Sequence, residues 1–391
     1  MDVQAVARAV EERRGDLTGA LRDLVNVDSG SYSPAGVNQV ADLLEERFRG
    51  TGWEIERHAH RAEGGARQLG DVLIARAEGS GSHRVLLVCH MDTVWPDGTV
   101  SERPFRVEGD RAFGPGTSDA KSGLLAGTEA TDALRRLGDR TFGRVTFICN
   151  PDEEIGSPFS GSFITEAARE SDVAFVLEAG RENGDIVSAR KGITTVRAEL
   201  HGRSAHAGVE PERGRHAVLD AALKTVELPG LNGQLSGVTV NVGMVAGGTR
   251  PNVVPERCVL DIDVRAWEEA ALDEARRRIV EILESERVSG VRPEVHLNVE
   301  YPPMERSPGT QRLAGLAKAL GKELGLAFED ASTGGGSDAN VVAATGTPVL
   351  DGLGPVGGDD HSPDEWVDLA SIAPRVAILA GLIARAGETV G

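Results

Sequence analysis

In the stretch Leu86-Leu87-Val88-Cys89-His90-Met91-Asp92-Thr93-Val94, an apolar run ends abruptly in a His-x-Asp pair. The run is apolar on both faces, which predicts a strand buried inside a sheet. Ligand sites in open α/β sheets lie just beyond the carboxyl ends of the strands. We therefore expect His90 and Asp92 on one face at the end of this strand, where an imidazole and a carboxylate make half of a metal site.

Helix and strand patterns alternate on both sides of this stretch. Apolar spacing predicts helices over 3–27, 36–49, 120–137, 309–325 and 368–386. It predicts strands over 53–58, 71–77, 84–89, 144–149, 173–177 and 347–350. The pattern is that of an α/β domain with a central mixed sheet flanked by helices. Because the chain has 391 residues, we expect two domains.

More metal-type side chains follow the predicted strands. Glu153 and Glu154 come directly after one apolar strand, and Glu178 comes directly after the next. Asp119 precedes a predicted helix, where capping that helix is its alternative role. His361 lies in the last polar loop and supplies a second imidazole. Three strand ends with the same kind of residue favour metal or acid–base chemistry over solvated loops.

The pattern changes between residues 188 and 300, which we expect to form an inserted domain. Its predicted elements are, in order, strand 192–200, helix 213–227, strand 237–246, strand 256–265, helix 267–286 and strand 293–299. This βαββαβ order is that of a ferredoxin-like unit. The first domain would then consist of residues 1–187 and 301–391. The edge strands of the insertion are expected to pair with a second copy in a homodimer.

Polar residues also stand out in the insertion and in the loop after it. Lys191, His206, Asn252 and Arg265 each have an ordinary alternative role in a turn, a cap or a charged surface. The loop 333–340 is rich in glycine and offers backbone N–H groups to an anion. It lacks the lysine of a phosphate-binding P-loop, so we do not expect a nucleotide site.

Charge and composition exclude several partners. The net charge of −19 argues against nucleic acid and anionic membranes. The three cysteines lie in apolar runs and are expected to be buried thiols. The N-terminal residues form no signal peptide, and no apolar run approaches the roughly 18 residues of a membrane helix. We therefore expect a cytoplasmic protein.

Taken together, these motifs resemble the di-zinc exopeptidases and amidohydrolases of the M20 peptidase group. Within that group the chain looks most like the glutamate carboxypeptidases. The resemblance covers nearly the whole chain and rests on the combination of motifs in this order. Its carriers are His90-Met91-Asp92, Gly116–Gly123, Asp152–Ser157, Glu178, Arg190-Lys191-Gly192, Ser204–Gly208, Asn252, Arg265, Gly334–Asp338 and His361-Ser362.

The resemblance implies two Zn²⁺ ions per subunit, for which Co²⁺ or Mn²⁺ can substitute. Asp119 would bridge the two ions. His90 and Glu178 would complete the coordination of one ion, and Glu154 and His361 that of the other. Two ions held in this way can activate water and polarise a carbonyl group.

The resemblance also implies the remaining roles. Glu153 would be the general base, Asp92 would orient His90, and His206 would reach from the other subunit to stabilise the oxyanion. The substrate would be a small molecule with a free carboxylate. Its binding residues would be Lys191, Asn252, Arg265 and the backbone of Gly336.

The implied activity is hydrolysis of an amide bond that releases a C-terminal amino acid from an N-acyl amino acid or small peptide. One departure affects glutamate as the released residue: the segment Tyr301-Pro302-Pro303-Met304 lacks the basic residue of glutamate-releasing members, and Arg306 follows it. The alternatives are a deacylase like the acetylornithine deacetylases and desuccinylases, and a non-catalytic binding protein on a peptidase scaffold.

Overall fold

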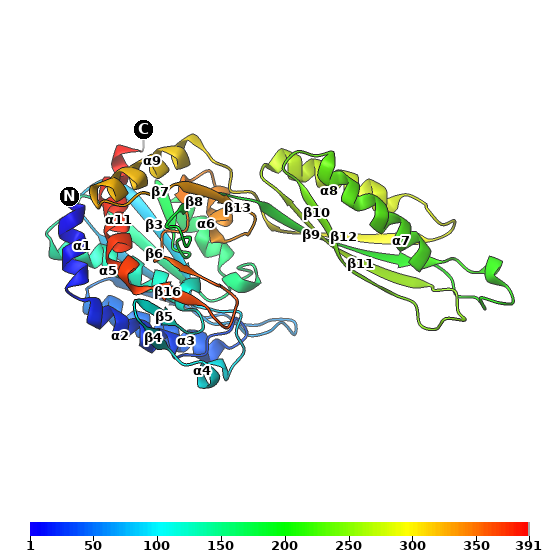
Figure 1. The fold of residues 1–391 in the computed structure, drawn as a ribbon, viewed down its shortest axis with the longest axis horizontal. Coiled ribbons are helices and arrows are strands. Elements are labelled where there is room, and N and C mark those ends of the chain that lie inside the picture. Colours follow the sequence, from blue (N-terminus) through cyan, green and yellow to red (C-terminus); the bar gives the residue numbers. More distant parts are fainter. Residues whose placement is uncertain (390–391) are drawn as a thin grey trace. The chain divides into compact units, whose positions relative to one another are not determined.

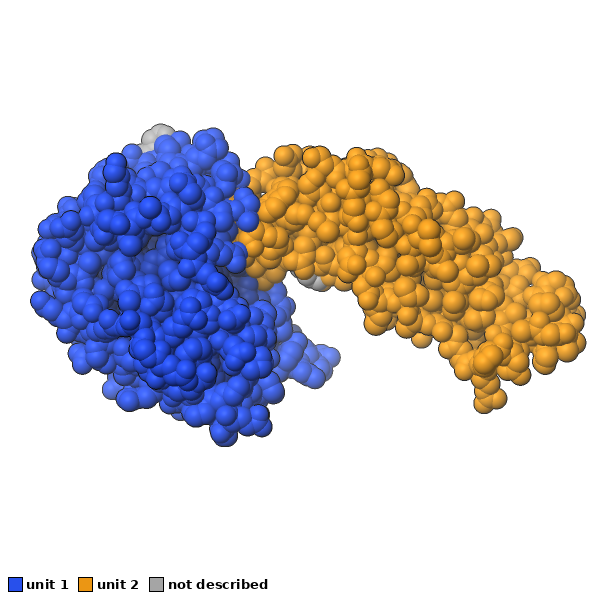
Figure 2. Space-filling model, in the orientation of Figure 1, with its two compact units in different colours: residues 1–188, 306–332, 337–391 blue, residues 189–305, 333–336 orange. Residues whose placement is uncertain are grey.

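The computed structural model describes residues 1–389, without the side chains of residues 299 and 300. The chain forms two compact units, which Figure 2 shows in different colours. Unit 1 comprises Met1–Ser188, Arg306–Ser332 and Ser337–Gly391, and unit 2 comprises Ala189–Glu305 and Thr333–Gly336. The loop segment Thr333–Gly336 therefore belongs to unit 2, whereas the predicted first domain includes it.

A six-stranded mixed sheet forms the centre of unit 1 (Figure 1). Its order is β1 (Glu54–His58), β2 (Val72–Glu78), β6 (Arg144–Asn150), β3 (Arg84–His90), β7 (Val173–Val176) and β14 (Val349–Leu350). β6, β3, β7 and β14 run parallel to one another, and β1 and β2 are antiparallel to their neighbours. β3 is buried from Val85 to His90 because its apolar residues face packed layers on both sides. The predicted α/β class with a mixed sheet is confirmed.

Helices cover this sheet. They are α1 (Val3–Glu11), α2 (Arg14–Val25), α3 (Pro34–Gly50), α4 (Thr99–Glu102), α5 (Ser122–Arg136), α6 (Gly161–Arg169), α9 (Pro308–Glu323), α10 (Asp338–Ala343) and α11 (Ile372–Arg385). The prediction of one helix over 3–27 was wrong, because the chain turns between Glu11 and Arg14. The apolar residues on both sides of this turn enter the same core, so their spacing continues through the break.

α11 packs against α1, α5 and α9 inside unit 1. Together with its flanking residues, Leu369–Glu388, it is long and apolar enough to cross a membrane by length and composition alone. The expectation that no segment reaches this length was therefore wrong. Arg375 and Arg385 interrupt the apolar run in the sequence, which hides the segment from a search for uninterrupted runs. Most of the segment is buried in the protein, as in the core helix of a globular domain.

Unit 2 is a four-stranded antiparallel sheet with two helices and a core of its own. Its elements are β9 (Gly192–His201), α7 (Ala217–Glu227), β10 (Thr239–Gly247), β11 (Arg257–Ala266), α8 (Glu269–Glu284) and β12 (Arg292–Tyr301). The strand order is β10-β11-β9-β12. This order and the βαββαβ sequence of elements confirm the ferredoxin-like prediction.

Two smaller sheets were not predicted, and most of their strands span only two to four residues, too few to show a periodic pattern. β8 (Ile186–Arg190) pairs with β13 (Asp330–Thr333). A second small sheet has the order β15 (Gly357–Gly358), β16 (Trp366–Asp368), β5 (Arg111–Phe113) and β4 (Arg106–Glu108). β15 and β16 are antiparallel, and the loop between them carries His361. The short sheet thereby fixes both ends of this loop.

Candidate metal centre

Five predicted metal ligands lie together in unit 1, and three of them lie at or just after the ends of parallel strands. His90 ends β3, Glu154 lies in a 3₁₀ turn (Glu153–Ile155) after β6, and Glu178 lies just after β7. Asp119 lies in a turn, Thr117–Lys121, that leads into α5. His361 arrives from the β15–β16 loop. The carboxyl edge of the sheet brings these side chains to one place, as the sequence predicts.

Asp119 lies at the middle of this group. One carboxylate oxygen, Oδ1, is 2.9 Å from His90 Nε2, and the other, Oδ2, is 3.0 Å from His361 Nε2. A second carboxylate accompanies each histidine. Glu178 Oε2 is 3.7 Å from His90 Nε2, and Glu154 Oε2 is 3.2 Å from His361 Nε2. The arrangement has two halves, each with an imidazole and a carboxylate, and Asp119 shared between them.

This donor set suits a divalent cation. Ligand atoms of His90, Asp119 and Glu154 lie within 4.8 Å of one another. Within residues 1–389, Glu154 Oε1 is buried and has no hydrogen-bond partner. A buried carboxylate oxygen without a partner is costly unless a cation occupies the space beside it. Imidazole nitrogen and carboxylate oxygen are the ligands that Zn²⁺ takes in such sites.

Burial and the close spacing of carboxylates raise the pKa values of several side chains in this centre. Burial raises the pKa of Glu178 to about 7. Hydrogen bonds to Asp119 and Glu154 raise the pKa of His361 to about 11. Burial opposes protonation of His90, but Glu178 and Asp119 outweigh it and raise the pKa of this imidazole well above its ordinary value. Negative charge thus dominates the centre, which favours a cation among the carboxylates.

Backbone strain is confined to the loops of this centre. Among the described residues, three non-glycine residues have a positive φ: Ser157 at 51°, Asp359 at 57° and His361 at 62°. Ser157 follows the Glu153–Ile155 turn, and the other two lie in the β15–β16 loop. Side chains other than glycine rarely adopt this conformation, so these loops are held in place by their surroundings.

Asp92 holds the Glu153–Glu154 turn as well as His90. The closest oxygen to His90 Nδ1 is the backbone carbonyl of Asp92, at 2.9 Å, and the carboxylate is 3.4 Å away. The carboxylate accepts hydrogen bonds from the backbone N–H groups of Glu153 and Glu154, at 3.1 and 3.2 Å. It also accepts one from Ser31 Oγ, at 2.7 Å. Asp92 therefore joins the end of β3 to the turn that carries two of the candidate residues.

Glu153 is half-buried beside the ligands. The pKa of its carboxyl group is raised well above the ordinary value. Burial is the largest cause, and repulsion from the Glu178 carboxylate is the second. A carboxylate with a raised pKa can take a proton from a nearby water and release it later. This position is consistent with the predicted role as general base.

Glu365 is a residue of this centre that sequence reasoning missed. Its carboxylate is buried and accepts hydrogen bonds from the backbone N–H groups of Gly116, Ser118 and Asp119, at 2.9 to 3.1 Å. These hydrogen bonds connect the Asp119 turn to the segment that carries His361 and Glu365. The sequence shows Glu365 only as one acid in a loop of acids, so nothing in the sequence separated it from solvated neighbours.

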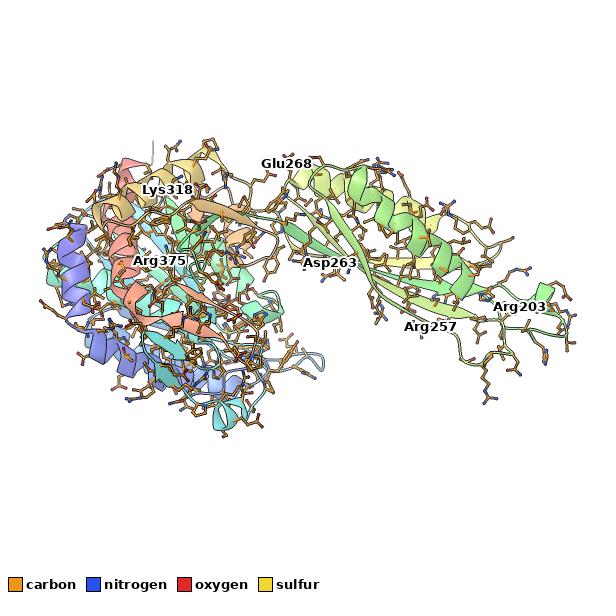
Figure 3. All side chains as sticks on the ribbon, viewed as in Figure 1. Arg203, Arg257, Asp263, Glu268, Lys318 and Arg375 are labelled. Atoms are coloured by element: carbon orange, nitrogen blue, oxygen red, sulfur yellow. The ribbon has the colours of Figure 1, made fainter. Side chains whose placement is uncertain are left out.

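In unit 2, three of the predicted substrate residues lie at one end of the sheet. Lys191 directly precedes β9, and Arg265, near the end of β11, pairs in register with Ile193. The Arg265 guanidinium donates one hydrogen bond to the backbone carbonyl of Gly334, at 2.8 Å, and another to the carboxylate of Asp263. Asp263 is labelled in Figure 3. Gly336 lies against Tyr301, and a Cβ at this glycine would be 2.7 Å from the tyrosine ring.

His206 and Asn252 lie at the other end of the same sheet. The last residue of β9, His201, pairs with the first residue of β11, Arg257. His206 lies in the loop after β9, and Asn252 lies in the loop before β11. The backbone N–H of Ala207 donates to the carbonyl of Asn252, at 3.0 Å. The ten residues of β9 span roughly 30 Å. Within one unit 2, Asn252 therefore cannot bind the same carboxylate group as Arg265 and Gly336.

Arg306, the candidate substitute for the missing basic residue, belongs to unit 1. Its guanidinium is 3.2 Å from the carboxylate of Asp330 and donates to Ser188 Oγ at 2.9 Å. The positive charge is therefore already paired within the unit.

Comparisons with known proteins agree with this geometry. The model of peptidase family M20/M25/M40 matches residues 86–385. Carboxypeptidase G2 of Pseudomonas sp. (strain RS-16) is 30% identical over 380 residues, which are 96% of this chain and 90% of that protein. Acetylornithine deacetylase of Myxococcus xanthus is 25% identical over 94% of this chain and 97% of its own length. The crystal structure of aminopeptidase PepT from Bacillus cereus superposes with a TM-score of 0.80 at 25% identity and covers 96% of this chain and 99% of that one.

Proposed function

The chain belongs to peptidase family M20/M25/M40, and from that premise we propose that it is a di-zinc hydrolase of N-acyl amino acids or small peptides. It would cleave the amide bond before a C-terminal amino acid and release that amino acid. The reaction class agrees with the relatives, which include a carboxypeptidase and a deacetylase.

The position of Asp119 carries this proposal. Its two oxygens face two different histidines, and each histidine has a carboxylate of its own nearby. His90, Asp119 and Glu178 would hold one ion, and His361, Asp119 and Glu154 the other. Two bound Zn²⁺ ions would supply Lewis-acid chemistry, lowering the pKa of water and polarising the scissile carbonyl.

Side chains of the protein would transfer the proton from the attacking water to the leaving group. Glu153, with its raised pKa, would take a proton from the attacking water and pass it to the nitrogen of the leaving amino acid. Asp92 would keep the turn of Glu153 and Glu154 fixed through its two backbone hydrogen bonds. A fixed base can act without costly rearrangement during the reaction.

We further propose that the enzyme is a homodimer in which His206 and Asn252 serve the partner's site. Their distance from Arg265 along the sheet supports this role, since the two ends of one unit 2 cannot meet at one substrate. Unit 2 also exposes apolar side chains of the kind that a second copy covers. They are Leu219, Leu223 and Val226 on α7, and Met244 and Val245 on the edge strand β10.

The substrate's carboxylate would bind near Arg265, Lys191 and the backbone at Gly336. The guanidinium of Arg265 suits a carboxylate through its paired donors. Glutamate is one candidate for the released residue, but Arg306 is already paired with Asp330 and does not favour it over other amino acids. A deacylase of N-acyl amino acids is the second candidate, supported by the deacetylase among the relatives. A non-catalytic binding protein is disfavoured because every ligand and base position is present.

A cytoplasmic location remains a prediction, which the three buried free cysteines support.

The test combines metal analysis with a substrate panel. Purified protein should contain about two Zn²⁺ per chain, lose activity with a chelator and regain it with zinc. A panel of N-acetyl amino acids, N-aroyl amino acids, folate-type compounds and dipeptides would identify the released residue. Hydrolysis of none of them by the zinc-loaded protein would contradict the proposed function. One tight ion or none, with activity intact, would contradict the two-metal assignment alone.

A further inference from the structure

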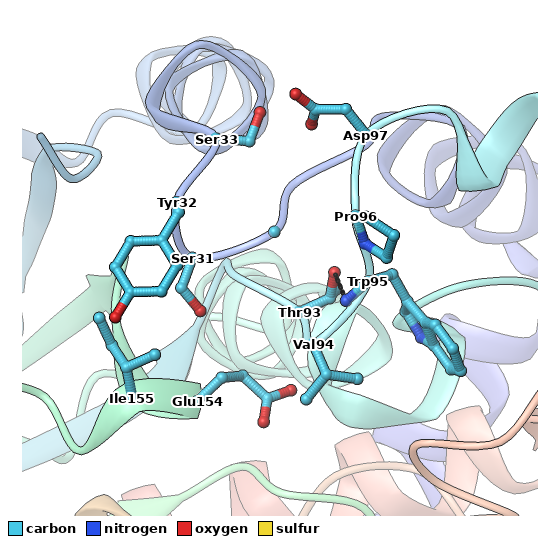
Figure 4. Close-up of a pocket in the computed structure, with 11 residues that line it drawn as sticks. Ser31, Tyr32, Ser33, Thr93, Val94, Trp95, Pro96, Asp97, Glu154 and Ile155 are labelled. Carbon is cyan, nitrogen blue, oxygen red and sulfur yellow. Dashed lines mark hydrogen bonds between the residues drawn. The ribbon is translucent and has the colours of Figure 1, made fainter. Parts of the chain in front are cut away.

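A cavity of about 410 Å³ opens in unit 1 directly beside the metal centre (Figure 4). Glu154, a candidate ligand, forms part of its wall. The segments 30–33 and 93–97 supply most of the remaining lining, together with Ile155. A group bonded to a carbonyl at the centre can therefore extend into this cavity without leaving unit 1.

The walls of the cavity are apolar and partly aromatic. Tyr32 and Ile155 face Val94, Trp95 and Pro96 across the space (Figure 4). Tyr32 is 52% exposed and Val94 is 43% exposed, so both present apolar surface to the cavity. Exposed apolar and aromatic walls beside a reaction centre favour a ligand that buries them.

Hydrogen bonds fix the two walls to each other. The N–H of Ser31 donates to the carbonyl of Thr93, at 3.3 Å, and the N–H of Thr93 donates to the carbonyl of Ser29, at 2.9 Å. Gly30 permits this approach, because a Cβ there would lie 2.4 Å from the carbonyl oxygen of Trp95. The shape of the cavity is thus preformed, which lowers the entropic cost of binding.

Asp97 is the charged lining residue of this cavity that is not also a candidate metal ligand. Asp97 and Glu154 are its charged lining residues, and both are acidic. Figure 4 shows Asp97 beside Ser33, at the opposite end from Glu154 and Val94. Arg67 and Arg103 stack on the rings of Tyr32 and Trp95, at 4.5 and 4.0 Å, but neither lines this cavity. Arg67 instead lines a separate cavity that shares Tyr32 and Ile155 with this one.

We propose that this cavity is the acyl-group site and that it selects a neutral or cationic, preferably aromatic, acyl group over one with a second carboxylate. The inference rests on the proposed function, since it places the acyl side of the scissile bond beside Glu154. The apolar walls bind the body of the acyl group. Asp97 repels a distal carboxylate and attracts a distal ammonium group.

The experiment compares three acyl groups of nearly equal shape on one amino acid, the residue that the wild type releases best. They are benzoyl, 4-(aminomethyl)benzoyl and 4-carboxybenzoyl, with acetyl as the small reference. For each, kcat/KM is measured with the zinc-loaded wild type and with Asp97→Lys, Tyr32→Ala and Glu102→Lys. Glu102 lies on α4, is exposed and does not line the cavity, so its replacement matches the charge change of Asp97→Lys.

We expect the wild type to prefer aminomethylbenzoyl and benzoyl over carboxybenzoyl. Asp97→Lys should shift the aminomethyl-to-carboxy ratio about 5- to 20-fold toward the carboxylate, because an exposed, solvent-screened charge is reversed. Tyr32→Ala should lower kcat/KM for the benzoyl substrate about 10-fold and leave the acetyl substrate within about 2-fold. Glu102→Lys should change neither ratio.

Two results would overturn the inference while the proposed function stands. One is a wild type that prefers the carboxybenzoyl substrate. The other is a set of ratios that Asp97→Lys and Tyr32→Ala leave unchanged while hydrolysis continues. If the wild type hydrolyses no N-acyl amino acid at all, the proposed function fails and the inference fails with it.

Discussion

Asp92 shows how one side chain can serve two neighbouring parts of a site. The family resemblance implies that the Asp92 carboxylate orients His90, but the Asp92 oxygen nearest to Nδ1 of the ring is the backbone carbonyl. The carboxylate instead accepts the N–H groups of Glu153 and Glu154 and the hydroxyl of Ser31. Glu153 and Glu154 are 61 and 62 residues away from Asp92 in the sequence. No local pattern encodes such a contact, so the sequence could predict the presence of Asp92 at the site but not its partners.

The roles of the adjacent glutamates are separable by substitution. Glu153→Gln should retain two Zn²⁺ per chain, because Glu153 is not a ligand in the proposed site, and should lower kcat by at least about 10²-fold. Glu154→Gln should instead lower the zinc content, because it removes a ligand charge. Metal analysis and steady-state kinetics on both variants distinguish the roles. Loss of zinc from Glu153→Gln would mean that the two assignments are reversed.

Glu365 should matter to metal binding although it touches no metal in the proposed site. Glu365→Gln places an amide NH₂ against backbone N–H donors, leaving at least one buried donor without an acceptor, at a cost of about 1–3 kcal/mol. The Asp119 turn should loosen, and zinc affinity should fall about 10- to 100-fold. Competition with a chromogenic chelator measures this change. Asp364→Asn, at the exposed neighbouring residue, should leave the affinity unchanged.

At the scale of the element, strands with buried apolar runs were predicted, and the hairpin that carries His361 was not. β3, β6 and β7 were predicted from apolar runs, and the candidate ligands at their ends were predicted with them. β15 and β16 span two and three residues, so no period could reveal the hairpin that places His361. The positions of Lys191 and Arg265 at one end of unit 2, and of Asn252 at the other, required the register of β9 and β11.

α5 approaches β7 closely enough that only glycine fits at one position. A Cβ at Gly123 would lie 2.0 Å from the carbonyl oxygen of Leu177, the residue before Glu178. Gly123→Ala should therefore push α5 away from Glu178, lower zinc content and reduce stability by about 1–3 kcal/mol. Urea unfolding and metal analysis check this result.

The matched control is Gly315→Ala, in the interior of α9. A Cβ at Gly315 would meet no atom within 4 Å, and the residue is exposed. This change should stabilise unit 1 by up to about 1 kcal/mol through helix propensity. Equal destabilisation by both substitutions would show that the effect at Gly123 is not the close contact with Leu177.

At the scale of the whole molecule, the proposed dimer predicts complementation between defective chains. His206→Ala and Asp92→Asn should each be nearly inactive as pure dimers. When the two variants are unfolded and refolded together, mixed dimers contain one site with both defects and one with neither. A statistical mixture should regain roughly a quarter of wild-type activity, if the sites are independent.

Size-exclusion chromatography and differently tagged chains establish whether mixed dimers form. A mixture that contains them and remains as inactive as its parents would mean that His206 acts within its own chain or has no role in catalysis. A third variant, Asn252→Ala, should complement Asp92→Asn in the same way, because His206 and Asn252 lie at the same end of unit 2.

The position of α11 in unit 1 has a consequence for how the protein is made in the cell. α11 is the last α-helix of the sequence, yet it packs against α1, α5 and α9. Ribosomes add about 5–20 residues per second, so the apolar faces of α1 and α5 stay uncovered for roughly 10 s or longer before α11 is complete. Residues 189–305 carry a core of their own and can fold during that interval. Chaperones that cover these apolar faces during translation should therefore raise the soluble yield of the enzyme.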